Sequence, residues 1–398
     1  MLFFRSSVAV AALLVATPAF AATAEQDTIV VTAKSLKQTG ADLAACLARN
    51  CPPDEDVRAT LAHAENQFVA GGYKNARTTL LQSVGRNRRH GKAYPVPVSD
   101  LLRANGRIAA HLGETDSFQL STIASRDILK SGVGADDPRT LVGTIEVADM
   151  RAKLGYTDEA DRIYRQVGER ARVLNLPFIA AASEIRGAWL RLESEQADDR
   201  KEGRARLMKL AESSDATGKM ARLAAKVLLA RLDRKHGKMD GTQALLAEYA
   251  SMGGTVQPTL LAYEPIKLPE VSFRPNDERN VLSQIATKNF DGQWFDVGFW
   301  ITPDGHVSEV EVIRKNGTED QWVKPVLASI STRVYAPLKR EPGDPGVFAV
   351  ERYTLTSSWE DRLGTRLRQR SAIPTIERMD LTAEQIAAPP PVTPKAGS

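Results

Sequence analysis

The sequence has little net charge, few aromatic residues and only two cysteines. Its 398 residues carry a formal charge of +4, which is too close to neutral for a dedicated nucleic-acid-binding protein. The cysteines, Cys46 and Cys51, form no C-x-x-C motif, and only His63 lies near them in sequence, so redox catalysis and metal binding are not expected. Beyond the N-terminus, no apolar run reaches the roughly 20 residues that a membrane-spanning helix needs.

Catalytic motifs are missing as well. The five histidines show no H-E-x-x-H spacing, and no G-x-S-x-G elbow occurs. Gly85–Lys92 has one residue too many between its glycines for a phosphate-binding loop, and its basic side chains are expected on a solvated connector. The pair Asp136-Asp137 precedes Pro138, which indicates a helix N-cap rather than an acid–base pair. We therefore expect no enzyme activity and no cofactor.

The N-terminus has the pattern of an export signal. Arg5 is followed by the apolar run Val8–Ala16 and then by Ala19-Phe20-Ala21, an A-x-A cleavage pattern. The apolar run is too short to cross a bilayer, so we expect a cleaved signal peptide over residues 1–21 and a periplasmic protein without a membrane span. An uncleaved N-terminal anchor is the alternative.

The two cysteines are expected to pair in an oxidising compartment. A continuous helix would hold residues five apart too far from each other for a disulfide, so the helix must break near Asn50. Pro52-Pro53 directly after Cys51 favour such a break. Free or differently paired thiols are the alternative.

The middle of the chain, from Asp54 to Tyr249, is rich in Ala, Leu, Arg and Glu and predicts only helices and short turns. Two windows place a small residue, a glycine and a second small residue at spacings of seven and five. These residues are Ala64, Gly71 and Ala76, then Ala148, Gly155 and Ala160. Both windows resemble tetratricopeptide repeats, in which small residues let paired helices approach and glycine makes the turn. An ordinary helical bundle is the alternative.

Gln293–Trp359 predicts a small α+β module. Its expected elements are a strand over Trp294–Thr302, a turn over Thr302–His306, a strand over Val307–Arg314 with a bulge near Ser308, a helix over Val323–Val334 closed by Pro337, and a last strand over Phe348–Ser358. This module resembles the C-terminal domain of the TonB energy-transducer family. The matching residues are Asp304, Gly305, Val307, Tyr335 and Pro337. An unrelated α+β domain with an ordinary hairpin is the alternative.

The resemblance implies that an extended peptide docks by strand addition. We expect the exposed edge to be the last strand, with Phe348, Val350, Arg352 and Thr354 on it. A short β-branched segment after the signal peptide resembles the TonB box of outer-membrane receptors. It consists of Asp27, Thr28, Ile29, Val30, Val31, Thr32 and Ala33. A coincidental β-prone segment is the alternative, and strand exchange between two copies remains open.

These patterns predict an α+β multidomain protein, with an N-terminal TPR-like α-solenoid followed by a small TonB-like domain of antiparallel sheet and one helix. The expected divisions are a signal peptide at 1–21, an N-terminal segment with a short helix at 22–53, helical repeats at 54–252, a linker at 253–277, the TonB-like domain at 278–360, and a charged, then Pro-rich tail at 361–398. Within the linker, Leu260–Phe273 is expected to run as an edge strand or arm of the terminal module, and the charged segment Asp361–Arg370 is expected to be helical.

The expected function is that of a periplasmic, non-catalytic adaptor linked to TonB-dependent transport or envelope assembly. Its partners would be envelope proteins, with TonB-dependent receptors or a TonB protein as candidates, and a homodimer is left open. A true energy transducer keeps an N-terminal anchor and a long Pro-rich spacer, and neither pattern is present. A structural repeat scaffold without peptide docking and an envelope-polymer hydrolase are the alternatives.

Overall fold

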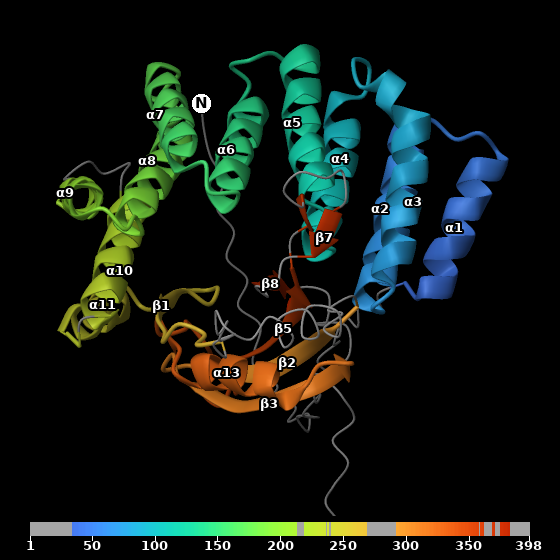
Figure 1. Cartoon of the computed structure of the whole chain (residues 1–398). Coiled ribbons are helices and arrows are strands. Elements are labelled where there is room, and N and C mark those ends of the chain that lie inside the picture. The colour runs from blue at the N-terminus through green and yellow to red at the C-terminus, as the bar shows by residue number, and fades with distance from the viewer. Residues whose placement is uncertain are drawn as a thin grey trace, which may run out of the picture.

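The computed structural model describes residues 34–212, 219–235, 237, 238, 240–268, 292–357, 359–361, 368–370 and 375–382. It consists of an N-terminal helical region followed by a C-terminal region built on an antiparallel sheet, as expected (Figure 1). Within the described residues, none of the helices combines the length and the apolar character that crossing a bilayer requires.

The helices follow one another as antiparallel neighbours and form an arc above the sheet (Figure 1). They are α1 (Leu36–Ala48), α2 (Pro53–Val69), α3 (Tyr73–Asn87), the short 3-10 helix η1 (Arg88–His90), α4 (Pro95–His111), α5 (Thr115–Gly132), α6 (Pro138–Lys153), α7 (Thr157–Val173), α8 (Pro177–Leu192), α9 (Ala197–Ala211), α10 (Lys219–Lys235) and α11 (Asp240–Ser251). Asp137 caps α6 with its side chain and Pro138 begins the helix, as predicted.

The two glycine windows join paired helices. Gly71 lies between α2 and α3 with a φ of +86°, and Gly155 lies between α6 and α7 with a φ of +84°. Only glycine adopts this backbone conformation without strain. The small residues of both windows are buried where the paired helices meet: Ala64, Ala76, Ala148 and Ala160. The spacing of small residues and glycine therefore predicted two helical hairpins correctly.

The predicted disulfide between Cys46 and Cys51 is present, and the Cα atoms of the two residues are 5.2 Å apart. Helix α1 ends at Ala48, and Asn50 adopts a φ of +51°, which turns the chain back so that the two side chains meet. Pro53 then begins α2. The helix break that the disulfide requires therefore lies at Asn50, as predicted.

The main sheet has the strand order β3-β2-β5-β8 and is antiparallel throughout. Its strands are β2 (Trp294–Ile301), β3 (Val307–Asn316), β5 (Val347–Thr356) and β8 (Thr375–Asp380). The β2–β3 hairpin turns at Gly305, and the bulge predicted near Ser308 lies at the next residue, since Glu309 has a φ of +51° and the register shifts beside it.

Three expectations about the C-terminal region are wrong. Helix α13 (Asp320–Ser331) ends before Pro337, because β4 (Val334–Tyr335) leaves the helix to pair with β1 (Leu260–Ala262). Strand β1 itself lies within Leu260–Phe273, the part of the linker that is expected to run as an edge strand or arm. The charged segment 361–370 is expected to be helical, but its described residues lie in the paired strands β6 (Trp359–Asp361) and β7 (Arg368–Arg370). Finally, the expected tail contributes strand β8.

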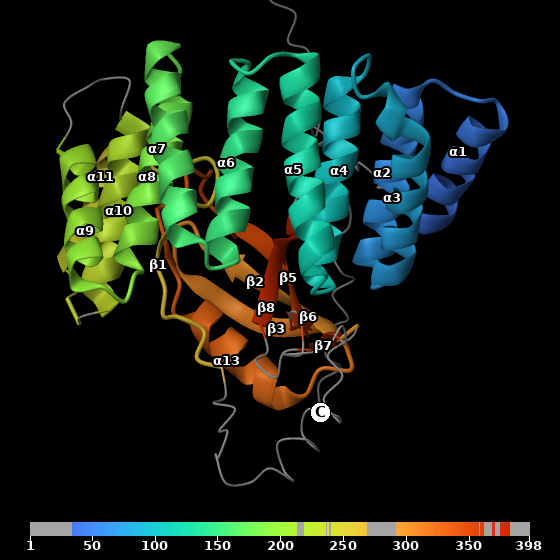
Figure 2. The ribbon, with the colours of Figure 1, turned by 45° about the horizontal axis from the view of Figure 1, so that its top comes forward.

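The helical arc contacts the sheet region at both of its ends (Figure 2). At the N-terminal end, Trp294 of β2 belongs to the hydrophobic core of α2, α3 and α4. At the C-terminal end, Leu261 of β1 and Ala336 pack with residues of α10 and α11, such as Leu223 and Tyr249. The residues at 255–262 are therefore a structural bridge between the two regions.

Candidate peptide-docking edge

The two faces of the sheet have different neighbours because side chains alternate along each strand. One face of β2 carries Phe295, Val297 and Phe299, which pack with Val326 and Ile330 of α13. The opposite face carries Trp294, which packs with the helical region, and Asp296, which pairs with Arg352 of β5. The sheet is thus covered by a helix on one side and by the end of the arc on the other.

Arg352 of β5 joins the sheet to the helical region. Its guanidinium is fully buried and pairs with the equally buried Asp296 at 2.6 Å. It also donates hydrogen bonds to the backbone carbonyls of Phe68 (2.6 Å) and Val69 (2.8 Å) at the end of α2, and lies 3.8 Å from the ring centre of Trp294. The last carbonyls of a helix have no i+4 partner, and among the described residues the carbonyl of Phe68 accepts otherwise only from the turn, from the backbone N–H of Gly71 at 2.8 Å, so Arg352 caps α2 from the sheet.

Thr354 continues this contact two residues further along β5. Its hydroxyl lies 2.7 Å from the hydroxyl of Tyr73 and 3.0 Å from Nδ1 of His111. Burial, together with the positive charges of Lys153 and Arg352, lowers the pKa of His111 to about 3. His111 is therefore neutral in the folded protein at physiological pH.

The prediction that β5 is an exposed docking edge is wrong. Residues 351–356 of β5 pair with β8 on one side, and the whole strand pairs with β2 on the other. Val350, Arg352 and Thr354 are buried, and the half-buried Phe348 packs against Trp300 at 5.3 Å between ring centres. No peptide can add along residues 351–356, whose two sides are already paired, so strand addition over Arg352 and Thr354 is excluded.

The sheet instead ends at β3 on one side and at β8 on the other. Strand β8 lies beneath the helices: Glu377 forms an ion pair with Lys153 of α6, and Met379 packs against the core of α2 to α4. Among the described residues β3 pairs with β2 alone, and it lies on the side of the sheet far from the arc (Figure 1). The free edge is therefore β3.

A pocket of about 380 Å³ borders this edge. Its lining comes from two elements, Val312, Ile313, Arg314 and Lys315 of β3, and Asp320, Val323, Lys324 and Leu327 of α13. Successive strand residues point to opposite faces, so a pocket lined by four consecutive residues reaches the backbone edge itself. The arrangement offers unpaired backbone groups beside an apolar helix surface with lysines on its rim, which suits an extended peptide with alternate apolar side chains.

A buried polar network fixes α13 against the sheet. Arg333, two residues beyond the helix, donates to both carboxylate oxygens of Glu351 at 2.9 Å and to the hydroxyl of Tyr353 at 2.9 Å. Burial and the neighbouring Glu351 charge raise the pKa of Tyr353, which keeps its hydroxyl protonated. The helix that forms one wall of the pocket is thus tied to the centre of the sheet.

The other predicted sites divide into two cases. The TonB-box-like segment, Asp27–Ala33, lies outside the described residues. Cys46 and Cys51 lie near Glu55, a grouping of metal-ligand type, but their sulfurs are bonded to each other and a disulfide sulfur is not a thiolate ligand. The cysteines therefore act as a covalent staple between α1 and the turn that leads into α2.

Sequence reasoning missed the edge because it missed β8. In Thr375–Asp380 the two apolar residues, Ile376 and Met379, are three apart, so the alternation that marks a half-buried strand is absent. Strand β5 gave no signal either: Arg352 and Thr354 alternate with apolar residues, which is the pattern of a half-buried strand, yet both of its faces are buried.

No model of a known protein family matches the chain, and a search of curated proteins finds no match. The interpretation of the site therefore depends on its geometry and on the sequence patterns that led to it.

Proposed function

We propose that this chain is a non-catalytic adaptor of the periplasm, whose helical region binds a protein partner and whose C-terminal module binds an extended peptide along β3. The observation that carries the proposal is the edge of β3, which is free of any other described strand and lies beside the pocket formed with α13. Export is supported by the signal-like N-terminus, and the disulfide between Cys46 and Cys51 suits an oxidising compartment.

The TonB-like interpretation of the module is supported by its hairpin, helix and closing strand, which follow in the order of the resemblance. The turn residue Gly305 also has a structural role, because its carbonyl accepts a hydrogen bond of 2.7 Å from Tyr335. The tetratricopeptide-like interpretation of the helical region is supported by the glycine turns and buried alanines of its two windows. A link to TonB-dependent transport or envelope assembly follows from these likenesses.

The test uses a synthetic peptide that spans Asp27–Ala33 and the mature full-length chain. Hydrogen exchange measured by mass spectrometry should show protection of residues 307–316 when the peptide is bound, because strand addition pairs their free backbone groups. Residues 375–380 should not change. Protection that appears elsewhere but not on β3 would refute the proposed docking edge.

A charge variant sharpens the test. Lys324 is exposed on the rim of the pocket, and Lys324→Glu should weaken peptide binding by roughly tenfold, about 1.4 kcal/mol, by placing a negative charge beside the acidic end of the peptide. Lys339→Glu is the matched control, since Lys339 is an exposed lysine of the same module outside the pocket. Equal effects from the two variants would show non-specific attraction.

The competing candidate is a structural repeat scaffold. It is favoured by one observation, that the edge of β5 is already covered by the chain's own strand β8. If the peptide does not bind at all and Lys324→Glu leaves recovery of envelope partners unchanged, the scaffold interpretation is the better one.

A further inference from the structure

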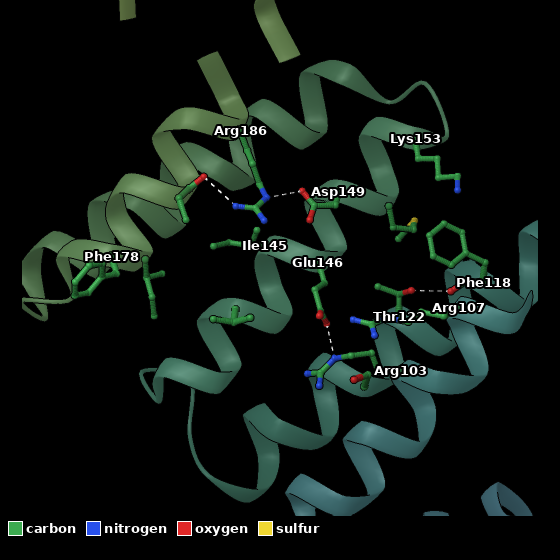
Figure 3. Close-up of a pocket in the computed structure, with 15 residues that line it drawn as sticks. Arg103, Arg107, Phe118, Thr122, Ile145, Glu146, Asp149, Lys153, Phe178 and Arg186 are labelled. Atoms are coloured by element: carbon green, nitrogen blue, oxygen red, sulfur yellow. Dashed lines mark hydrogen bonds and ion pairs between the residues drawn. The ribbon is translucent and has the colours of Figure 1, made fainter. Parts of the chain in front are cut away.

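A second and larger pocket, of about 600 Å³, lies within the helical region (Figure 3). Its lining residues come from the alternate helices α4, α6 and α8 of the arc, and from α5, which lies between α4 and α6. It shares no residue with the pocket beside β3. Its volume falls within the range of about 300–1,000 Å³ that is usual for ligand sites in proteins.

The apolar part of this pocket is unusually open to solvent. Phe178 at the start of α8 is 71% exposed and Val142 on α6 is 42% exposed, although both are large apolar residues. Ile145 and Met150 of α6 are buried and form the floor. An exposed aromatic side chain beside a buried apolar floor is typical of a surface that another chain covers.

The charged groups of the pocket are paired with one exception. Glu146 pairs with Arg103 at 2.9 Å, and Asp149 pairs with Arg186 at 3.2 Å (Figure 3). Arg107 of α4 also lines the pocket and is exposed, but it has no hydrogen-bond or ion-pair partner among the residues that the structure describes. Both carboxylates of the lining are thus satisfied, and the remaining unpaired charge is a guanidinium.

The pocket is also connected to the sheet. Lys153 at the end of α6 lies over the ring of Phe118 at 5.6 Å and forms an ion pair with Glu377 of β8. Figure 3 places Phe118 and Lys153 on one side of the pocket and Phe178 on the other. The side near Lys153 is therefore held by the C-terminal region, while the side near Phe178 is open.

We propose that this pocket binds an acidic, partly apolar peptide segment of a partner protein. A glutamate or aspartate of the segment pairs with Arg107, because a guanidinium binds a carboxylate with two parallel hydrogen bonds. An apolar side chain of the segment covers Phe178 and Val142. The inference names the ligand class of the helical region and so rests on the proposed adaptor function.

Charge complementarity decides between occupants. A basic segment would bring a positive charge to unpaired Arg107 and would have to break the pair of Glu146 or Asp149 with its arginine to find a partner. A purely apolar segment would cover Phe178 but leave the Arg107 guanidinium without a counter-charge. An acidic segment with apolar neighbours satisfies both surfaces at once.

The test uses a short fluorescein-labelled peptide of glutamates with a central phenylalanine and an amidated C-terminus. Binding to the mature full-length chain is measured by fluorescence anisotropy. Arg107→Glu and Phe178→Ala should each weaken binding at least tenfold. The controls are Arg89→Glu, an exposed arginine outside the pocket, and Val173→Ala, an apolar residue that is 74% exposed on α7; both should bind as the unmodified chain does.

Three results would overturn the inference: equal weakening by Arg89→Glu and Arg107→Glu, binding of a lysine-containing version of the peptide as tightly as the acidic one, or no binding of the acidic peptide at millimolar concentration. Circular dichroism of each variant checks that the helices are retained. Lys324→Glu, which affects the edge of β3, should leave this binding unchanged. Failure of the two proposals can therefore be told apart.

Discussion

Replacement of Arg352 by methionine tests how the sheet is held on the helical region. Methionine keeps the length and the apolar stem of the side chain but removes the charge. The variant loses the ion pair with Asp296 and the hydrogen bonds to the carbonyls of Phe68 and Val69. Asp296 keeps a second partner, Arg314, at 2.6 Å.

The expected loss of unfolding free energy is about 3–5 kcal/mol, the usual cost of removing one partner from a buried ion pair. The loss of unfolding free energy is this large because both Arg352 and Asp296 are fully buried, so water cannot replace the lost contacts. An exposed pair gives the contrast: Lys34 and Asp42 are 68% and 49% exposed, and Lys34→Met should cost about 0–1 kcal/mol.

The assay is urea unfolding at 25 °C, followed by circular dichroism for the helices and by tryptophan fluorescence, to which Trp294 contributes from the contact itself. In the variant the fluorescence transition should move to lower urea than the helical transition, because the contact opens before the arc unfolds. Asp296→Asn combined with Arg352→Met should cost less than the sum of the two single variants. A loss below about 1 kcal/mol for Arg352→Met, or equal losses for Arg352→Met and Lys34→Met, would refute the anchoring role.

Two further predictions follow from the same region and from the hairpin turn. The pKa of His111 is lowered from 6.5 to about 3, so its neutral form is favoured by folding, and this contribution is complete above pH 6.5 and is lost as the pH falls towards 3. From these two pKa values, His111 should lower the free energy of unfolding by about 2 kcal/mol between pH 7 and pH 5. His111→Asn should remove that part of the pH dependence in urea unfolding. An unfolding free energy that depends on pH as strongly in the variant as in the unmodified chain would contradict this prediction. At the turn, a Cβ on Gly305 would lie 2.1 Å from the carbonyl oxygen of Tyr335, whereas one on Gly343, with nearly the same φ, meets nothing within 4 Å. Gly343→Ala should therefore lower the free energy of unfolding by about 1–2 kcal/mol, and Gly305→Ala should lower it clearly more, as measured by thermal unfolding. Equal losses would show that the backbone near Tyr335 shifts to make room for the added Cβ.

Local features were predicted well from the sequence. The hairpin around Gly305, the bulge beside Ser308 and the break at Asn50 each depend on the backbone preferences of residues only a few positions apart. The same holds for the helix ends at Gly71 and Gly155, where a positive φ is required. Such signals survive in a single sequence because the residues that cause them are neighbours in the chain.

The candidate site was predicted only in part. The expectation of a free sheet edge in the C-terminal module named the wrong strand. Strand β5 is the edge only if the segment after residue 360 is a tail. Because β5 pairs with Thr375–Asp380, the free edge among the described strands is β3. Strand order depends on which distant segment supplies the next partner, and a weakly alternating segment gives no local sign of it.

The sequence by itself determined the succession of elements: a disulfide-closed first turn, helical hairpins turned by glycines, and a C-terminal hairpin, helix and strand. Only the tertiary structure decided which backbone edge is free and how the two regions meet. The hydroxyls of Tyr73 and Thr354, 281 residues apart, lie 2.7 Å from each other across that contact. No pattern of neighbouring residues encodes such a pair, because it forms only when two independently built surfaces pack together and exclude water.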